Sequence, residues 1–141
     1  MACAFCEIVS RSEPAEIVLE TETSVGFLDV RPLFPGHTLI VPRLHHETLA
    51  DVPVGAVGPL FGDVQVMQRS VEAFGAQGAF VAVNNRVSQS VPHVHIHVVP
   101  RTKGDGLKGF FWPRQKYRDD QHRAEVGAAL RNAVTDVMMQ S

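Results

Sequence analysis

Three histidines alternate with aliphatic residues in the segment His93-Val-His-Ile-His-Val-Val. On a β-strand, successive side chains point to opposite faces, so His93, His95 and His97 would share one face and their aliphatic neighbours the other. Three imidazoles do not suit an apolar core, because each buried ring would need a hydrogen-bond partner. The pattern therefore predicts a strand that presents a row of imidazoles to a site.

The spacing of the three rings limits what they can bind. Four residues of strand span about 13 Å, whereas a nitrogen ligand lies about 2.1 Å from a zinc ion. One metal ion could take two of these rings but hardly all three, and an extended anionic group fits the row better. Imidazole titrates near neutrality, so the row can hold one neutral nucleophile beside charged donors. His37 begins another predicted strand and could add a fourth imidazole.

The remaining sequence predicts a small α+β domain with an antiparallel sheet. Apolar residues at three- and four-residue steps between Val57 and Phe74 predict a helix that ends at Gly75 and Gly78. Pro59 is compatible with that helix in its first turn. Short runs bounded by turn residues predict five strands at Ala15–Glu20, Ser24–Asp29, His37–Pro42, Ala79–Asn84 and His93–Val99.

The last part of the chain predicts an irregular loop followed by a second helix. Asp119 and Asp120 are the expected caps of this helix, and its apolar stripe is Val126, Leu130, Ala133 or Val134, and Val137. We expect His122 to be exposed. The three aromatic residues Phe110, Phe111 and Trp112 are unusual for a solvated segment, which favours their burial in a pocket or a partner.

Composition narrows the class of protein. The 141 residues suit one domain, and the formal net charge of −2 argues against a broad electrostatic grip on nucleic acid. No run of eighteen apolar residues and no basic, apolar leader are present, so we expect no membrane span and no signal peptide. The two cysteines, Cys3 and Cys6, cannot form the disulfide framework that a small secreted domain needs. The expected location is the cytoplasm.

Several motifs in order resemble the histidine triad (HIT) family. The segment from His93 to Val99 resembles the triad motif, and Pro35-Gly-His-Thr-Leu-Ile-Val-Pro-Arg-Leu-His45 resembles the second family signature. Gln89-Ser-Val-Pro-His93 and Phe27-Leu-Asp-Val-Arg31 also match, and Cys3-Ala-Phe-Cys-Glu-Ile-Val resembles the start of bacterial members. The resemblance covers about residues 3–112 and is nearest to the bacterial Hint and Fhit-like branches.

The resemblance implies a HIT-like α+β fold with a five-stranded antiparallel sheet and two main helices. It implies one domain over residues 1–141, with a core at about 3–112 and a C-terminal loop and helix at 101–139. It also implies a homodimer with the central helix and an edge strand at its interface. Met67 and Phe74 are therefore expected in the core or at that interface.

The resemblance also implies hydrolysis or transfer of nucleoside monophosphates through a covalent nucleotidyl-histidine. The nucleophile maps to His95, which must be neutral at its attacking nitrogen, while its other ring nitrogen donates to a backbone carbonyl. His97 and Ser90 are expected to stabilise the charge on phosphate, and Gln89 to lie near the bridging or leaving oxygen. His37 is expected to support the triad.

By position, the resemblance places the nucleoside as well. Asp29 would accept hydrogen bonds from both ribose hydroxyls, and Asn84 would contact the phosphate or the ribose. The expected walls of the base site are Phe5, Ile8, Phe27, Val30 and Leu39; plain core packing is the alternative for the aromatic members.

The spacing Cys3-Ala-Phe-Cys6 is that of one half of a zinc knuckle, which needs two more ligands. In bacterial relatives, the resemblance implies that these ligands are His45 and His93. His46 stands beside His45 as another possible third ligand, and two free thiols are the alternative to zinc. No acidic cluster suggests Mg²⁺, so we expect a hydrolysis step that needs no metal.

Three functions remain open from the sequence. The first is a hydrolase of purine nucleoside phosphoramidates or dinucleoside polyphosphates. The second is a nucleotidyl transferase or phosphorylase that uses phosphate as the acceptor, although His97 argues against the sugar-phosphate transferase branch, which usually has Gln there. The third is a nucleotide-binding regulatory protein with weak catalysis. Within the irregular loop Arg101–Arg118, the basic segment Lys103–Gly109 could steer a second phosphate or nucleotide or could be a mobile linker.

Overall fold

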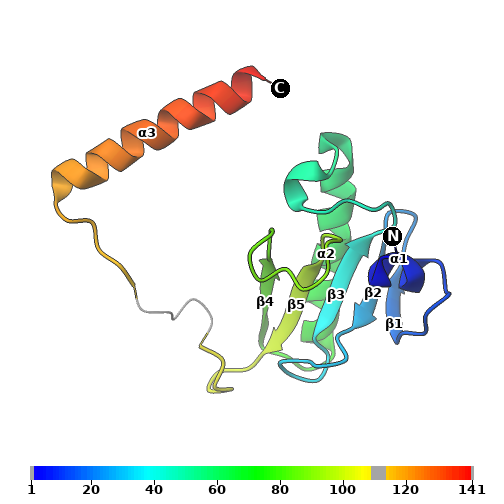
Figure 1. The fold of residues 1–141 in the computed structure, drawn as a ribbon. Helices are drawn as coiled ribbons and strands as arrows, with labels where there is room; N and C mark the ends of the chain where they lie inside the picture. The colour runs from blue at the N-terminus through cyan, green and yellow to red at the C-terminus, as the bar shows by residue number, and fades with distance from the viewer. Residues whose placement is uncertain (1, 109–113, 141) are drawn as a thin grey trace. The chain divides into compact units, whose positions relative to one another are not determined.

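The structure is a computed structural model that describes residues 2–108 and 114–140 (Figure 1). The chain divides into two compact units, residues 1–107 and residues 108–141. Each unit is described by itself. The segment Phe110–Trp112, predicted to be buried, lies outside the described residues. The predicted single domain over residues 1–141 remains a prediction.

The first unit is built on a five-stranded sheet in which every neighbouring pair is antiparallel. The strand order is β1-β2-β3-β5-β4, so the last strand in the chain inserts between β3 and β4. This confirms the predicted α+β fold with an antiparallel sheet. The strands are β1 (Ile17–Glu20), β2 (Ser24–Leu28), β3 (Thr38–Pro42), β4 (Gly78–Val83) and β5 (Ile96–Arg101).

The strand that carries the histidine row begins later than predicted. β5 starts at Ile96, so His93 and His95 precede the strand. The register that pairs Ile40 with Ile96 would place Pro42 opposite Val94, and proline has no N–H to extend the ladder. The Val94 N–H instead donates to the His46 carbonyl at 2.7 Å. The prediction of a strand from residue 93 was therefore wrong by three residues.

Helix α2 (Val54–Ala73) covers one face of the sheet (Figure 1). Its buried side chains are Leu60, Val64, Met67 and Val71, and they pack with Val94, Ile96 and Val98. Met67 thus belongs to the core, whereas Phe74, just after the helix, is 75% exposed.

Helix α2 differs from the prediction in the place of its proline. Pro59 is the sixth helical residue and lies beyond the first turn, because the helix begins at Val54, before the apolar stripe. It cannot donate a hydrogen bond to the Gly55 carbonyl. The helix ends at Ala73, two residues before the predicted Gly75, whose φ of 129° is the left-handed conformation that a glycine adopts readily after a helix.

Two short helical elements were not predicted. Helix α1 (Ala4–Val9) begins after Cys3, whose Sγ accepts a hydrogen bond from the Cys6 N–H. A 3₁₀ turn (η1) spans Leu49–Asp51. Helix α1 covers part of the sheet face opposite α2, where Phe5 joins a second apolar cluster with Phe27 and Leu39. Six residues are too few for a helical period to be visible in the sequence.

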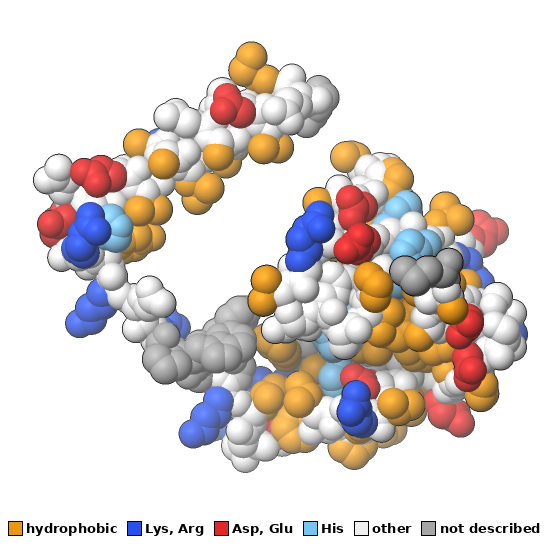
Figure 2. Space-filling view, in the orientation of Figure 1, with side chains coloured by type: hydrophobic (Ala, Val, Ile, Leu, Met, Phe, Trp, Pro, Cys, Tyr) orange, Lys and Arg blue, Asp and Glu red, His pale blue; other side chains and the backbone are white. Residues whose placement is uncertain are grey.

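The second unit contains helix α3 (Asp120–Met139). Asp119 caps it, as predicted, because its Oδ1 accepts from the His122 N–H at 2.7 Å. His122 is only partly exposed, since its Nδ1 accepts from the Arg118 N–H. Apolar side chains line this helix (Figure 2), and Val126, Leu130, Val134 and Val137 are exposed within the described residues. In the part of the chain that the structure covers, no helix has both the length and the apolar character that a bilayer crossing requires.

Candidate active site

A row of side chains crosses the sheet on the face opposite α2. Directly paired residues of neighbouring strands share a face, and the pairs Phe27–Leu39, Leu39–His97 and His97–Ala82 join four strands. Val94, Ile96 and Val98 point to the core on the other face. The alternation predicted from the sequence is thus present, although only His97 of the three histidines lies within the strand.

His95 lies next to His97 in this row, with their ring centroids 5.0 Å apart. The Nδ1 atom of His95 is 2.9 Å from the His93 carbonyl oxygen. A carbonyl can only accept, so the proton of the neutral ring is on Nδ1 and the lone pair is on Nε2. The ring is 2% exposed, and Phe5 packs edge-on against it at 5.0 Å. The nucleophilic nitrogen expected from the sequence is therefore available in the required tautomer.

His37 connects His97 to the loop that precedes β3. Its Nε2 lies 2.9 Å from His97 Nδ1, and its Nδ1 accepts from the Leu33 N–H at 3.0 Å. Burial lowers the pKa of His37, with Asp29 acting in the opposite direction. Burial, with the positive charges that His95 and His37 would carry, lowers the pKa of His97 to about 4. The two rings are therefore neutral at physiological pH.

We expect the half-buried neutral His97 to make the protein less stable in acid. The ordinary pKa of an unfolded histidine is about 6.5, so between pH 6.5 and pH 4 the unfolded chain binds more protons than the native one. The contribution of neutral His97 to the free energy of unfolding is fully present above pH 6.5. It is lost as the pH falls toward 4, by up to about 3 kcal/mol. Urea unfolding across this range should show a steeper loss for the wild type than for His97→Gln. The same pH dependence of the free energy of unfolding in both proteins would contradict the lowered pKa assigned to His97.

Asp29 follows β2 and lies beside the histidine pair. Its Oδ2 is 3.7 Å from His37 Nε2, and its Oδ1 accepts from the Arg31 N–H at 2.9 Å. The carboxylate is partly exposed, with 22% of its side-chain surface accessible. The structure thus brings the predicted ribose ligand to the edge of the imidazole row.

The loop between β4 and the triad carries the predicted phosphate-binding residues. The Gln89 side chain donates to the Glu47 carbonyl at 2.6 Å and accepts from the Arg86 N–H at 2.8 Å. It therefore braces the loop in this structure. Arg86 and Ser88 adopt left-handed φ values of 71° and 61°, which are uncommon outside glycine. Ser90 is exposed at the end of this loop, and Asn84 is half-buried at its start.

The predicted base-site residues divide into two groups. Phe5, Phe27 and Leu39 are buried in one apolar cluster, and Ile8 packs against it. Val30 is 92% exposed and lies outside the cluster. The cluster thus supplies an apolar wall beside His95. Its members Phe5, Phe27 and Leu39 are also part of the hydrophobic core.

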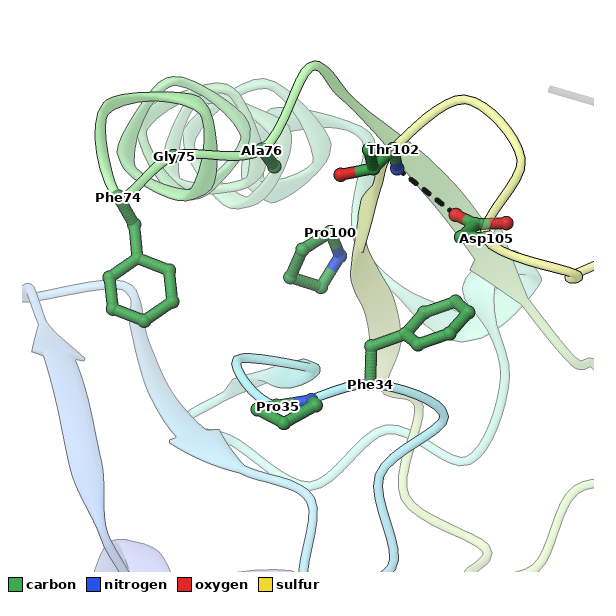
Figure 3. Close-up of a pocket in the computed structure, with 8 residues that line it drawn as sticks. All are labelled: Phe34, Pro35, Phe74, Gly75, Ala76, Pro100, Thr102 and Asp105. Carbon is green, nitrogen blue, oxygen red and sulfur yellow. Dashed lines mark hydrogen bonds between the residues drawn. The ribbon is translucent and has the colours of Figure 1, made fainter.

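A separate hollow is lined in part by Phe34 and Pro35, which precede His37 in the chain (Figure 3). Its volume is about 290 Å³, and its apolar walls include Phe34, Phe74 and Pro100. No histidine lines it, and the Asp105 carboxylate is already bound to Arg101. The reactive groups lie in the histidine row, so we place the candidate active site there.

Gly36, just before His37, brings the backbone close to Pro100 and Phe74, which line this hollow. Its φ is +100°, and a Cβ at this position would lie 3.1 Å from Pro100 Cγ and 3.6 Å from the Phe74 ring. A side chain would be strained by both the conformation and the contacts.

A second cluster next to the row joins two cysteines and two histidines. The Cys3 and Cys6 Sγ atoms lie 3.4 Å and 3.5 Å from His93 Nδ1, and Cys6 Sγ lies 3.3 Å from His45 Nδ1. All four candidate ligand atoms are within 4.8 Å of one another. Sulfur and nitrogen ligands of one tetrahedral zinc ion lie about 3.6 Å apart. The donor set and its distances therefore fit a structural zinc site.

His93 is oriented for metal binding by its other nitrogen. Its Nε2 lies 2.9 Å from the Pro42 carbonyl, so the proton is on Nε2 and Nδ1 faces the cysteines. Burial lowers the pKa of His93, which favours the neutral ring that a metal needs. His46, the other candidate ligand, is not part of this cluster.

The sequence analysis missed the backbone partners of His37 and His93, and for His95 it predicted a backbone carbonyl without saying which residue supplies it. The Leu33 amide and the carbonyls of Pro42 and His93 each bind one histidine ring. No side-chain motif reveals them, because every residue carries a backbone carbonyl and every residue except proline carries an amide N–H.

Comparison with known proteins identifies the family. The HIT domain family matches residues 10–104, and this chain belongs to the HIT family. An uncharacterised HIT-like protein of Mycobacterium tuberculosis is 34% identical over 140 residues, with 95% of this chain and 94% of the relative covered. The resemblance read from the motifs is thus confirmed.

Relatives with named activities are also similar. The adenosine 5'-monophosphoramidase of Schizosaccharomyces pombe is 32% identical, and the match covers 88% of this chain and 92% of the relative. The asymmetrical bis(5'-nucleosyl)-tetraphosphatase of the same organism is 32% identical, with 64% and 52% covered. These names support a nucleotide hydrolase in general terms.

One similar solved structure is relevant to the candidate zinc site. A zinc-bound histidine triad family protein of Mycobacterium smegmatis has a TM-score of 0.73 and 35% identity, and the match covers 92% of this chain and 98% of that chain. The description of that protein as zinc-bound agrees with the type of donor set found here.

Proposed function

We propose that this chain cleaves purine nucleoside phosphoramidates or dinucleoside polyphosphates at the α-phosphate, through a nucleotidyl group on His95. The observation that carries the proposal is the hydrogen bond of His95 Nδ1 to the His93 carbonyl, which directs the lone pair to Nε2. A neutral imidazole with one anchored nitrogen is a competent nucleophile. The family match and the two hydrolase relatives support the same reaction class.

In the first step, His95 Nε2 attacks the α-phosphorus and a P–N bond forms. The bond from phosphorus to the leaving group breaks, and its electron pair departs with the nucleotide or with the amine nitrogen, which takes up a proton from solvent. The water of the second step releases a proton to solvent in turn. Negative charge develops on the equatorial oxygens, where fixed donors are most effective. We assign these donors to the His97 ring and the Ser90 hydroxyl.

In the second step, water attacks the phosphorus from the side that the leaving group has vacated. The P–N bond to His95 breaks, its electron pair returns to the ring, and a nucleoside monophosphate leaves. Inorganic phosphate in place of water would make the reaction phosphorolytic. We propose that Gln89 holds the Ser90 loop through Glu47 and Arg86, and that it turns to the bridging or leaving oxygen when substrate binds.

The nucleoside is assigned to the side of the row that carries Asp29. Its partly exposed carboxylate can accept from two ribose hydroxyls. The base is assigned to the apolar wall, and Asn84 to the phosphate or the ribose. The proposed residues of this wall are Phe5, Ile8, Phe27 and Leu39 from the cluster, with Val30 at the exposed rim.

We further propose that zinc is held by Cys3, Cys6, His45 and His93. The bound ion would join α1 to the segment before β5, and it has no role in bond cleavage. Thiolate ligands suit a reducing compartment, which favours the cytoplasm. We also propose a homodimer, since β4 is an edge strand with Val81 exposed and available for pairing; a monomer in analytical ultracentrifugation would contradict it.

The test combines a trapped intermediate with a substrate panel. The protein is mixed with adenosine phosphoramidate, diadenosine tetraphosphate or a guanosine phosphoramidate, with and without inorganic phosphate, and quenched in base. We expect mass spectrometry to find a nucleoside monophosphate on His95 and release to be fastest for one leaving-group class. The same kinetics separate hydrolysis from phosphorolysis. Turnover without any adduct on His95, or no turnover of the whole panel, would refute the proposal.

A further inference from the structure

Two neighbouring rings in the row have opposite hydrogen-bonding needs. His95 must offer a lone pair to phosphorus, whereas His97 must offer an N–H to a phosphate oxygen. The His93 carbonyl explains the first ring. A second backbone group, the Leu33 amide, lies at the other end of the chain of contacts that runs through His37 to His97.

The proton on His37 can be placed from its two partners. The Leu33 N–H donates to His37 Nδ1 at 3.0 Å, so Nδ1 carries a lone pair and the proton of the neutral ring is on Nε2. His37 Nε2 is 2.9 Å from His97 Nδ1. It therefore donates to His97 Nδ1, and the proton of a neutral His97 is left on Nε2.

The short nitrogen–nitrogen distance argues for a shared proton and against a metal ion at this point. Two nitrogen ligands of one tetrahedral zinc ion lie about 3.4 Å apart, whereas 2.9 Å is a normal hydrogen-bond length. His37 is 3% exposed, so water does not compete for the bond. The pair is a hydrogen-bonded unit.

We propose that His37 is a positioning residue through which the Leu33 backbone amide fixes His97 as a hydrogen-bond donor at Nε2. This inference rests on the proposed function for its catalytic meaning, although the tautomers themselves exist in the free protein. One backbone carbonyl thus makes His95 an acceptor, and one backbone amide makes His97 a donor. The two roles are fixed before substrate arrives.

The same chain of bonds keeps the pair neutral. An additional proton on His37 Nδ1 would face the Leu33 N–H, and one on His97 Nδ1 would face the N–H at His37 Nε2. The lowered pKa of each ring agrees with this. The other titratable groups that face the pair are His95 and Asp29, and only Asp29 favours protonation.

Hydrogen bonds of the backbone fix the loop between Asp29 and His37, which carries the Leu33 amide. The His37 N–H donates to the Phe34 carbonyl at 3.0 Å, and the Asp29 N–H donates to the His37 carbonyl at 2.9 Å. The Arg31 N–H is bonded to Asp29 Oδ1. The Leu33 side chain, in contrast, is 53% exposed. It is therefore the amide of this residue, and not its side chain, that the fold uses.

The first test reads the tautomers directly in the free protein. Long-range ¹H–¹⁵N correlation on protein with ¹⁵N-labelled histidine shows which ring nitrogen carries the proton. We expect the proton on Nε2 for His37 and His97 and on Nδ1 for His95. A proton on Nδ1 of His97 or of His37 would overturn the proposal.

The second test removes the amide. Leu33→Pro has no N–H, and Leu33→Ala is the matched control that keeps it. We expect Leu33→Ala to retain the His97 tautomer and turnover. Leu33→Pro should yield a mixture of tautomers, a His97 pKa that rises toward its ordinary value, and kcat at least about 10-fold lower with KM within about 3-fold. An unchanged His97 tautomer in folded Leu33→Pro would overturn the proposal.

A second pair of variants decides the matter if Leu33→Pro fails to fold. His37→Gln keeps an N–H that can donate to His97 Nδ1, whereas His37→Ala has none. We expect Gln to preserve the His97 tautomer and most of kcat, and Ala to lose both; equal tautomers in the two variants would refute the inference. If the wild type turns over no substrate, the proposed function fails, while the NMR results still decide the inference.

Discussion

Replacing His95 with alanine is expected to lower turnover by about 10⁴-fold or more, because the covalent route disappears with the nucleophile. Nucleotide binding should persist, since Asp29, His97 and the apolar wall stay in place. Steady-state kinetics measure the first effect, and calorimetric titration with a nucleoside monophosphate measures the second. His95 is 2% exposed, so alanine also leaves a cavity.

His95→Asn is the matched control for that cavity. Its side-chain amide can still donate to the His93 carbonyl, but it offers no nucleophilic nitrogen. We expect it to be as inactive as the alanine variant and closer to the wild type in melting temperature. Turnover at the wild-type rate in either variant would refute the role assigned to His95.

Removal of the proposed zinc should produce the largest change in stability. His45→Asn deletes one ligand, and we expect a loss of bound zinc and a fall of about 10 °C or more in melting temperature, because metal-binding energy contributes directly to folding energy. Elemental analysis and calorimetry of protein purified without chelators measure the two effects.

The adjacent histidine provides the control for the zinc prediction. His46 lies outside the four-residue cluster, and its backbone carbonyl accepts a hydrogen bond from the Val94 N–H. His46→Asn should keep zinc and lose at most a few degrees. If both variants retained zinc, or if the wild type contained none, the proposed metal site would be wrong.

Most of the fold follows from local sequence patterns. The five strands, the central helix and the Asp119 cap were predicted, because period-two and helical apolar patterns depend on burial of one face. The start of β5 was missed by three residues, because it depends on which residue lies opposite it across the sheet. Pro42 ends that pairing from another strand. Helix α1 was missed because its six residues are too few to show a helical period.

Apart from the bond of His95 to a backbone carbonyl, the candidate site could be predicted as a set of side chains but not as a set of hydrogen bonds. Spacing placed the three imidazoles on one face, and the motif suggested Cys3, Cys6, His45 and His93 as one cluster. Which nitrogen of each ring carries a proton depends on backbone carbonyls and amides brought near by folding. The bonds of Gln89 to the loop depend in the same way on a backbone conformation that includes two left-handed residues.

The segment around β5 has a consequence for how this enzyme class can diversify. Val94, Ile96 and Val98 are 0% exposed, and they alternate along one backbone with the three histidine rings of the proposed site. A change of volume at any of these three positions would move the neighbouring rings along with the packing. New leaving-group preferences are therefore expected to evolve by exchange of residues in the flanking loops, 29–36 and 85–90, while the strand itself tolerates little drift.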